Sequence, residues 1–237
     1  MYKLIKYLLL LILLVETDIG YSQKFKVPQN LPRYDFKALH FGFTLGINSL
    51  DFKIKKNNNV LLNDTLLVLE SENQKGFNLG IVSNLRLGKY TDLRFIPTLV
   101  FGERHLKYSF TDSNSTYLTE KKRIESTLID FPLYIKYKSE RYNNLRTYVL
   151  VGIKYSLDIA SQDKIDDEGK KIIKLKENDL MGEIGFGMDF YLQYFKFAPQ
   201  IKLSYGIIDL LSEDKTVYTR SINKLLTNGW MLSFTFE

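Results

Sequence analysis

The residues of this 237-residue chain that could do chemistry are its two histidines and a set of charged side chains spaced two apart along apolar segments. His40 or His105 could serve as a general base beside nearby Asp or Ser residues, because an imidazole titrates near neutral pH. The two fall in segments predicted to place them at opposite ends of the protein, so they share no site. The sequence has no Gly-rich phosphate loop, HExxH motif, DxDxDG calcium loop or cysteine. We therefore expect a protein that is not an enzyme and has no cofactor or metal.

The charged set alternates with apolar residues. Glu183 and Asp189 share one face of their segment with glycines, whereas Ile184 and Phe186 share the other. We expect the charged face to line a narrow interior, where unpaired charges are costly and must pair across strands. It would form either a path for ions and small solutes or a polar plug. The predicted interior charges are Arg86, Arg94, Arg104, Asp130, Lys136, Lys154, Asp158, Glu183, Asp189, Lys196 and Lys202.

The elements that position these residues are strands, because eight segments show the two-residue alternation. Short connections, such as 88–90 and 192–194, alternate with long polar ones, such as 55–75 and 112–121. This is typical of outer-membrane barrels, whose short turns face the periplasm and whose long loops are extracellular. Pro97, Pro132 and Pro199 fall within the strands and require bulges or a strand start. The predicted strands are 39–49, 76–88, 91–104, 127–138, 146–160, 180–191, 195–207 and 230–237.

A soluble barrel would show the same alternation with its apolar face inward. The glycines of the strands share the polar face, which suits the crowded interior of an eight-stranded barrel. Aromatic residues of the apolar face, including Tyr137, Phe195 and Phe236, fall near the short turns, where an interfacial girdle is expected. The sequence thus predicts an all-β fold, an eight-stranded antiparallel transmembrane β-barrel. The glycines are Gly42, Gly46, Gly80, Gly102, Gly152, Gly185, Gly187 and Gly206.

The two ends of the sequence predict the location. Residues 1–22 have the charged start, short apolar run and small residues of a signal peptide, residues 23–38 would be a periplasmic segment, and residues 39–237 the barrel. On the apolar face of the last strand, Trp230, Phe234 and Phe236 are expected to signal insertion into the outer membrane. The net charge of +6 is scattered, which argues against nucleic acid. Outer-membrane lipid is the expected partner, and no small-molecule substrate is expected.

One block of the sequence resembles a known family. Residues 30–35 read NLPRYD and lead into HFGFTLGIN at 40–48, and RFIP at 94–97 and DFPL at 130–133 follow. This pattern resembles the PorT/SprT proteins, outer-membrane components of the type IX secretion system of Bacteroidetes, which is linked to gliding motility. The resemblance implies a role in protein secretion with other secretion-machine proteins as partners, and it implies no catalytic residues. Since water-filled channels need roughly 16 strands, cargo would not pass through this barrel, and an accessory or assembly role is expected.

The segment before the barrel is where we expect partners to dock. Arg33, Tyr34 and Phe36 are the candidate contact residues, although the same segment could instead pack into the barrel mouth as a plug. The alternative function is a structural or adhesive barrel unrelated to secretion, in which the long extracellular loops would carry the function.

Overall fold

The computed structural model describes residues 28–56, 66–111, 117–160, 175–211 and 222–237. The predicted signal peptide and the tips of the predicted long loops lie outside the described residues. Apart from a 3-10 turn, η1 (Tyr34–Phe36), the elements of the described chain are strands. They are β1 (Leu39–Lys56), β2 (Leu66–Arg86), β3 (Thr91–Phe95), β4 (Thr98–Thr111), β5 (Tyr117–Lys138), β6 (Leu145–Asp158), β7 (Asn178–Tyr191), β8 (Lys196–Gly206) and β9 (Ile222–Phe236).

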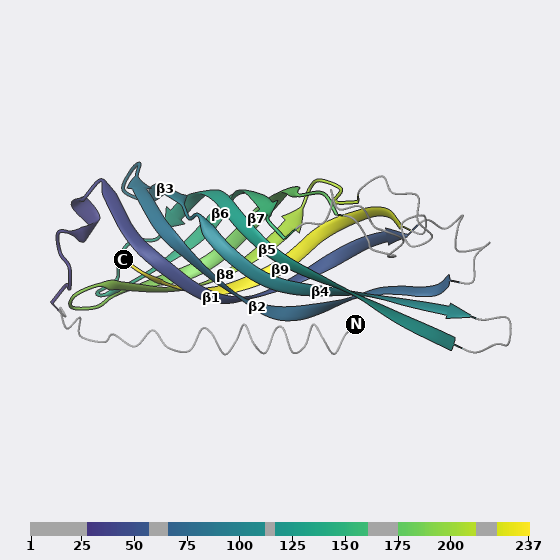
Figure 1. Cartoon of the computed structure of the whole chain (residues 1–237). Coiled ribbons are helices and arrows are strands. Elements are labelled where there is room, and N and C mark those ends of the chain that lie inside the picture. The colour runs from purple at the N-terminus through teal and green to yellow at the C-terminus, as the bar shows by residue number, and fades with distance from the viewer. Residues whose placement is uncertain (1–27, 57–65, 112–116, 161–174, 212–221) are drawn as a thin grey trace, which may run out of the picture.

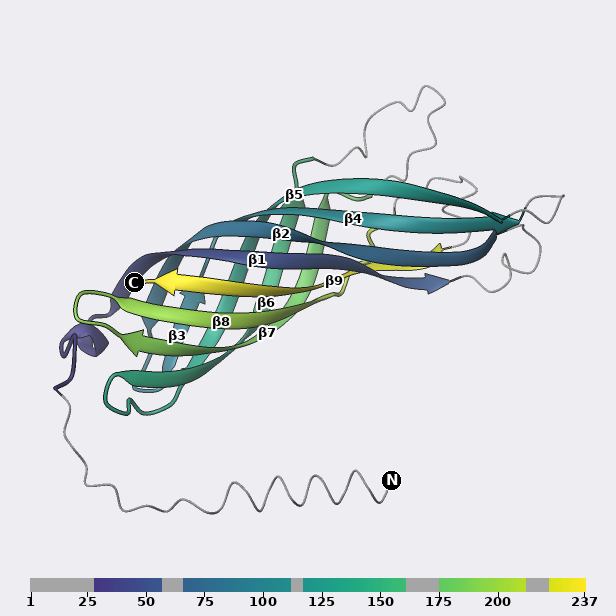
Figure 2. The ribbon, with the colours of Figure 1, turned by 90° about the horizontal axis from the view of Figure 1, so that it is seen from below.

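The strands form one closed antiparallel sheet. β1 pairs with β2 on one side and with β9 on the other, so the two ends of the sheet meet. β3 and β4 both pair with β2 and β5 and act as two parts of one strand, which makes a ring of eight. Figure 1 shows the strands winding obliquely around the barrel, and Figure 2 shows β1 beside β9 at the closure. The predicted all-β, eight-stranded antiparallel barrel is confirmed.

The break between β3 and β4 falls at Ile96 and Pro97. Proline has no N–H to donate to a neighbouring strand, so a continuous ladder is interrupted there. The neighbours remain bonded across the break, because Ile81 N donates to Pro97 O (3.0 Å) and Ile96 N donates to Pro132 O (3.5 Å). The barrel therefore keeps its closure through an irregular step in one strand.

Several strands are longer than predicted, and this corrects the predicted loops. β2 has 21 residues and β5 has 22, so much of the predicted loops 55–75 and 112–121 is strand. β9 likewise begins at Ile222 rather than at residue 230. The sequence pattern missed these extensions because their outward positions, such as Glu72 and Lys121, are charged and no longer alternate with apolar residues. β2, β4 and β5 project past the rest of the barrel at the end away from η1 (Figure 1).

A β-bulge marks where the projection begins. The pairing of β2 with β4 shifts register between Asn73 and Phe77. Gly76 lies in this step, and a Cβ there would meet Phe101 O at 1.9 Å, so only glycine fits. The bulge lets β2 follow the barrel on one side and the projecting hairpin on the other.

The outward face of the barrel is apolar along its middle. Its exposed side chains include Phe43, Ile81, Ile135 and Leu203, whereas large polar and charged side chains such as Arg94 are buried inside. The 11 residues of β8 rise ~3.3 Å each and, tilted by ~40°, cross ~28 Å, close to the ~25 Å apolar band of such barrels. The described residues contain no helix long and apolar enough to cross a membrane.

Candidate functional site

The centre of the lumen holds a buried network around Lys154 of β6. Its ammonium lies 3.1 Å from a carboxylate oxygen of Asp130 and 3.1 Å from one of Glu183. Ser156 donates to Asp130 (2.6 Å), and the hydroxyls of Tyr134 and Ser204 donate to Glu183. All of these side chains are buried, so the charges are compensated inside the barrel and not by bulk water.

A second network fills the lumen nearer the short turns. Lys136 of β5 contacts Asp189 (2.8 Å), and its ammonium lies 3.7 Å from the ring centroid of Tyr148. Lys196 of β8 lies 2.7 Å from the side chain of Glu237 and 3.8 Å from Asp189. Arg94 donates to the other carboxylate oxygen of Glu237 (2.5 Å). Positive and negative groups thus alternate across the lumen.

Two predicted interior arginines lie outside these networks. Arg86 lies at the rim, where its Nε donates to Gly88 O (3.3 Å). Arg104 lies towards the extracellular end, where it donates to Ser126 (2.6 Å) and its guanidinium stacks 4.1 Å from the ring centroid of Phe52. Glu237 and Tyr134 were not among the predicted site residues, although both share the inward two-residue spacing that could have identified them.

The segment before the barrel lies across the mouth at the short-turn rim. Tyr34 of η1 donates to Glu237 (2.8 Å), which links the segment to the lumen network. Its ring stacks on His40 with centroids 4.0 Å apart, and the His40 ring nitrogen Nε2 is 2.8 Å from Tyr34 O. Figure 1 shows η1 at the end of the barrel where the short turns and the C mark lie.

Asp35 fastens the same segment to β6 and β7. Arg146 donates to its two carboxylate oxygens (2.9 and 3.3 Å), and the Tyr191 hydroxyl donates at 3.0 Å. Burial opposes ionisation of this carboxyl, but Arg146, Tyr191 and Arg141 outweigh burial and hold its pKa below the usual value. These contacts hold the segment at the mouth of the barrel, and we call Asp35 with Arg146, Tyr191 and Arg141 the Asp35 clasp.

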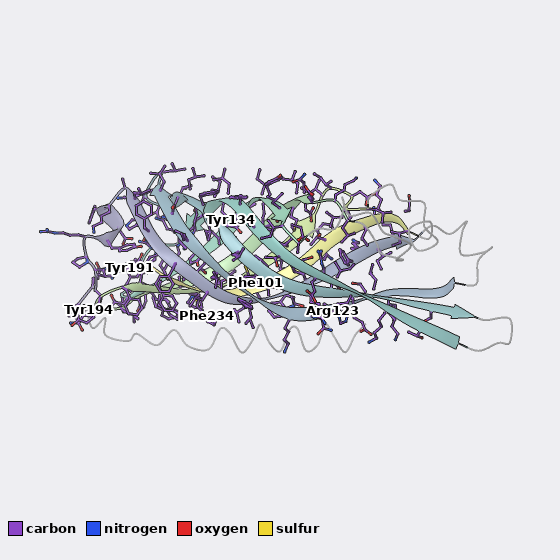
Figure 3. The ribbon with its side chains drawn as sticks, viewed as in Figure 1. Phe101, Arg123, Tyr134, Tyr191, Tyr194 and Phe234 are labelled. Carbon is purple, nitrogen blue, oxygen red and sulfur yellow. The ribbon has the colours of Figure 1, made fainter. Side chains whose placement is uncertain are left out.

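Asn30 provides the other attachment. Its side-chain amide donates to Tyr191 O (2.9 Å), and its backbone N–H donates to Asn144 Oδ1 (2.9 Å). Arg141 also donates to Asn30 O. Figure 3 shows Tyr191 and Tyr194 at this end of the barrel. A small polar pocket lies behind the segment, lined in part by His40, Asp92 and Lys138.

The three candidate docking residues face different ways. Tyr34 turns towards the lumen, whereas Arg33 is exposed and Phe36 has 78 % of its surface accessible. Of the predicted insertion residues, Phe236 stacks on Phe43 (5.0 Å between centroids) and Phe234 on Phe197 (6.0 Å), both on the outward face. Trp230 lies between Ser49 and Leu203 in the ladder and is half-buried.

The two histidines lie at opposite ends of the barrel. His40 pairs with Asn84 near the end of β2, whereas His105 pairs with Glu72 in the projecting part of the same strand. His105 contacts Glu103 next to it on β4. No group of three or more His, Cys, Asp or Glu side chains within the described ranges could hold a metal ion.

A closed ring with an apolar outer wall and a filled polar lumen defines the class of small outer-membrane β-barrels, and the protein resides in the outer membrane. The chain belongs to the outer membrane protein beta-barrel domain family, whose model matches residues 21–212. No curated protein matches the sequence.

Three solved structures are similar to this chain. Neisserial surface protein A has a TM-score of 0.44 and 9 % identity, over 84 % of this chain and 98 % of that one. OprG from Pseudomonas aeruginosa has a TM-score of 0.42 and 14 % identity, over 84 % of this chain and 92 % of that one. Ail of Yersinia pestis, solved with the heparin analogue sucrose octasulfate, has a TM-score of 0.37 and 12 % identity, over 83 % of this chain and 96 % of that one.

Proposed function

We propose that this protein is a non-enzymatic component of the type IX secretion machine that supports its assembly or operation from the periplasmic face of the outer membrane. The observation that carries the proposal is the position of residues 30–35, the block with the specific resemblance to PorT/SprT proteins. Asn30, Tyr34 and Asp35 of this block bond to the barrel, while Arg33 and the adjoining Phe36 are exposed. The block therefore presents a rigidly held surface on the periplasmic side.

The composition of that surface suits a protein partner. Besides Phe36, the short turns of the same rim carry exposed Tyr142 and Tyr194, with 70 % and 82 % of their surfaces accessible. Aromatic residues and arginine are enriched in protein interfaces and among the residues that dominate binding energy. Arg33 and Phe36 are the proposed contacts, and Tyr34 is proposed to hold the segment in place.

The filled lumen supports an accessory role rather than passage of cargo. Arg94, Lys136, Lys154 and their carboxylate partners cross the interior at two levels. A folded or unfolded protein would have to break both networks to pass, at the cost of leaving buried charges unpaired.

The docking proposal is tested with the double variant Arg33→Ala/Phe36→Ala in the native host. Secretion of type IX cargo is expected to fall at least tenfold, because two central contacts are lost, while heat-modifiable gel migration of the barrel stays unchanged. The control is Lys37→Ala/Lys89→Ala, which removes two exposed side chains from the same rim. Normal secretion in the Arg33/Phe36 variant, or an equal loss in the control, would contradict docking at this site.

The projection of β2, β4 and β5 favours a second candidate, a surface or adhesive barrel. Its exposed charged pairs, such as Arg123 with Glu125 (2.9 Å), extend beyond the apolar band. Removing the hairpin end 103–125 separates the two functions. It would abolish surface binding in the second case and leave secretion intact in the first.

A further inference from the structure

The outward face of β1 and β9 carries lysines above the apolar band. Lys55 of β1 lies directly opposite Lys224 of β9, and Lys53 lies two residues earlier on the same face of β1. All three are exposed. Side chains that face each other in an antiparallel pair have Cβ atoms about 5 Å apart, and like charges there destabilise the pair. The arrangement carries an electrostatic cost that a bound anion would remove.

The described part of the barrel supplies little negative charge to compensate these three lysines. Within the described residues, no carboxylate lies within ion-pair distance of Lys55 or Lys224. Lys53 contacts the Tyr205 hydroxyl, and its ammonium lies 4.8 Å from that ring's centroid. Asp51, the neighbouring carboxylate on β1, already accepts hydrogen bonds from Ser71 and from the N–H of Phe52.

The projecting strands β2, β4 and β5 show the contrasting arrangement. On the projecting strands, Lys121 pairs with Glu72 (2.8 Å), and Arg123 pairs with both Glu103 and Glu125 (2.9 Å each). Figure 3 shows Arg123 on this projection. These cations are neutralised by carboxylates of the projecting strands, whereas Lys55 and Lys224 have no such partner among the described residues.

The position of the lysines along the barrel axis indicates which layer of the membrane they face. Trp230 pairs with Ser49, and Tyr205 pairs with Asn228, which itself pairs with Asp51. Trp and Tyr side chains mark the membrane interface, so these residues lie at the upper edge of the apolar band. Lys53 lies two positions beyond Asp51, and Lys55 two positions further. Their flexible ammonium groups therefore reach the headgroup layer of the outer leaflet.

We propose that Lys53, Lys55 and Lys224 form a binding site for the phosphate groups of outer-leaflet lipid, the phosphorylated lipid A of lipopolysaccharide. The site holds the barrel at a defined depth and rotation with respect to a bound lipid, and it does not depend on the secretion role.

The test uses full-length protein in detergent, titrated with fluorescent bisphosphorylated lipid A or with dephosphorylated lipid A. The variant is Lys55→Gln/Lys224→Gln, and the matched control is Lys121→Gln/Arg123→Gln, which also removes two positive charges. Loss of two lysines near an anionic headgroup is expected to weaken binding of the phosphorylated lipid about 30-fold. Binding of the dephosphorylated lipid stays unchanged, and the control changes less than threefold. Heat-modifiable migration verifies that each variant is folded.

Three results would overturn the proposal. Equal affinity for both lipids would exclude phosphate recognition, and equal losses in the variant and the control would reduce the effect to net charge. Displacement of lipid A by inorganic phosphate as effectively as by unlabelled lipid A, at the same molar concentration, would assign the lysines to a free anion.

Discussion

At the scale of residues, the filled lumen depends on glycines that lie opposite large side chains. A Cβ at Gly187 would lie 2.4 Å from the ring of Tyr148, and one at Gly152 would lie 2.8 Å from the ring of Tyr134. Each tyrosine crosses the narrow interior because the facing residue has no side chain. The glycines of the polar face therefore make room for the buried networks.

Gly187→Ala is expected to destabilise the folded barrel by about 1–3 kcal/mol, because the added methyl group must displace the Tyr148 ring. Urea unfolding in detergent or lipid measures the change. Gly182→Ala is the matched control, since its Cβ would meet nothing within 4 Å, and its effect should stay within about 0.5 kcal/mol. Adding Tyr148→Leu should remove most of the difference between the two glycine variants; a difference that persists would show that Tyr148 is not its cause.

At the scale of elements, the position of residues 28–38 is the part of the fold that the sequence predicted least. The NLPRYD block suggested either a docking segment or a plug, and local pattern could not separate the two. The structure combines them, because alternate sides of one turn face different environments. Tyr34 and Asp35 meet β6, β7 and Glu237, whereas Phe36 remains exposed. These partners lie more than 100 residues away in the chain, so only the closed barrel brings them to the mouth.

The Asp35 clasp should weaken in acid. The pKa of Asp35 lies below its ordinary value of 3.8 in the folded protein, so its stabilisation is present above that value and is lost as the pH falls through the lower folded pKa. Protease cleavage or hydrogen exchange of residues 28–38 should therefore be slow at pH 7 and rise below about pH 4.

Asp35→Asn is expected to expose the segment already at pH 7 and to remove this pH dependence, while the strands stay protected. Asp51→Asn, in β1 at the end of the barrel away from η1, serves as the control. An unchanged pH profile in Asp35→Asn would assign the acid response to another group.

At the scale of the whole molecule, the two charge networks and residues 28–38 block the lumen one after another along the barrel axis. Reconstituted in planar bilayers, the protein is expected to show no steady unit conductance. Deleting residues 28–38 should not open it, because Arg94, Lys196 and Glu237 still cross the lumen beneath the segment. Regular conductance steps from the full-length protein would contradict a filled lumen.

The class of fold could be predicted from the sequence because a strand repeats every two residues, and this local period survives in every wall of a barrel. The period also predicted which charges face inward, including Lys136, Lys154 and Glu183. It failed where outward residues become charged beyond the membrane, and so β2, β5 and β9 proved longer than expected.

By itself, the sequence determined the strand pattern, the lipid-facing side and the polar interior, since all three depend on the spacing of neighbouring residues. The tertiary structure alone decided which charges meet, that Glu237 joins Arg94 to Lys196, and that Tyr34 and Asp35 close the mouth. It also decided that Lys55 and Lys224 face each other without a described carboxylate nearby. The physical reason is that these contacts depend on the register of strands brought together by ring closure, which no local period specifies.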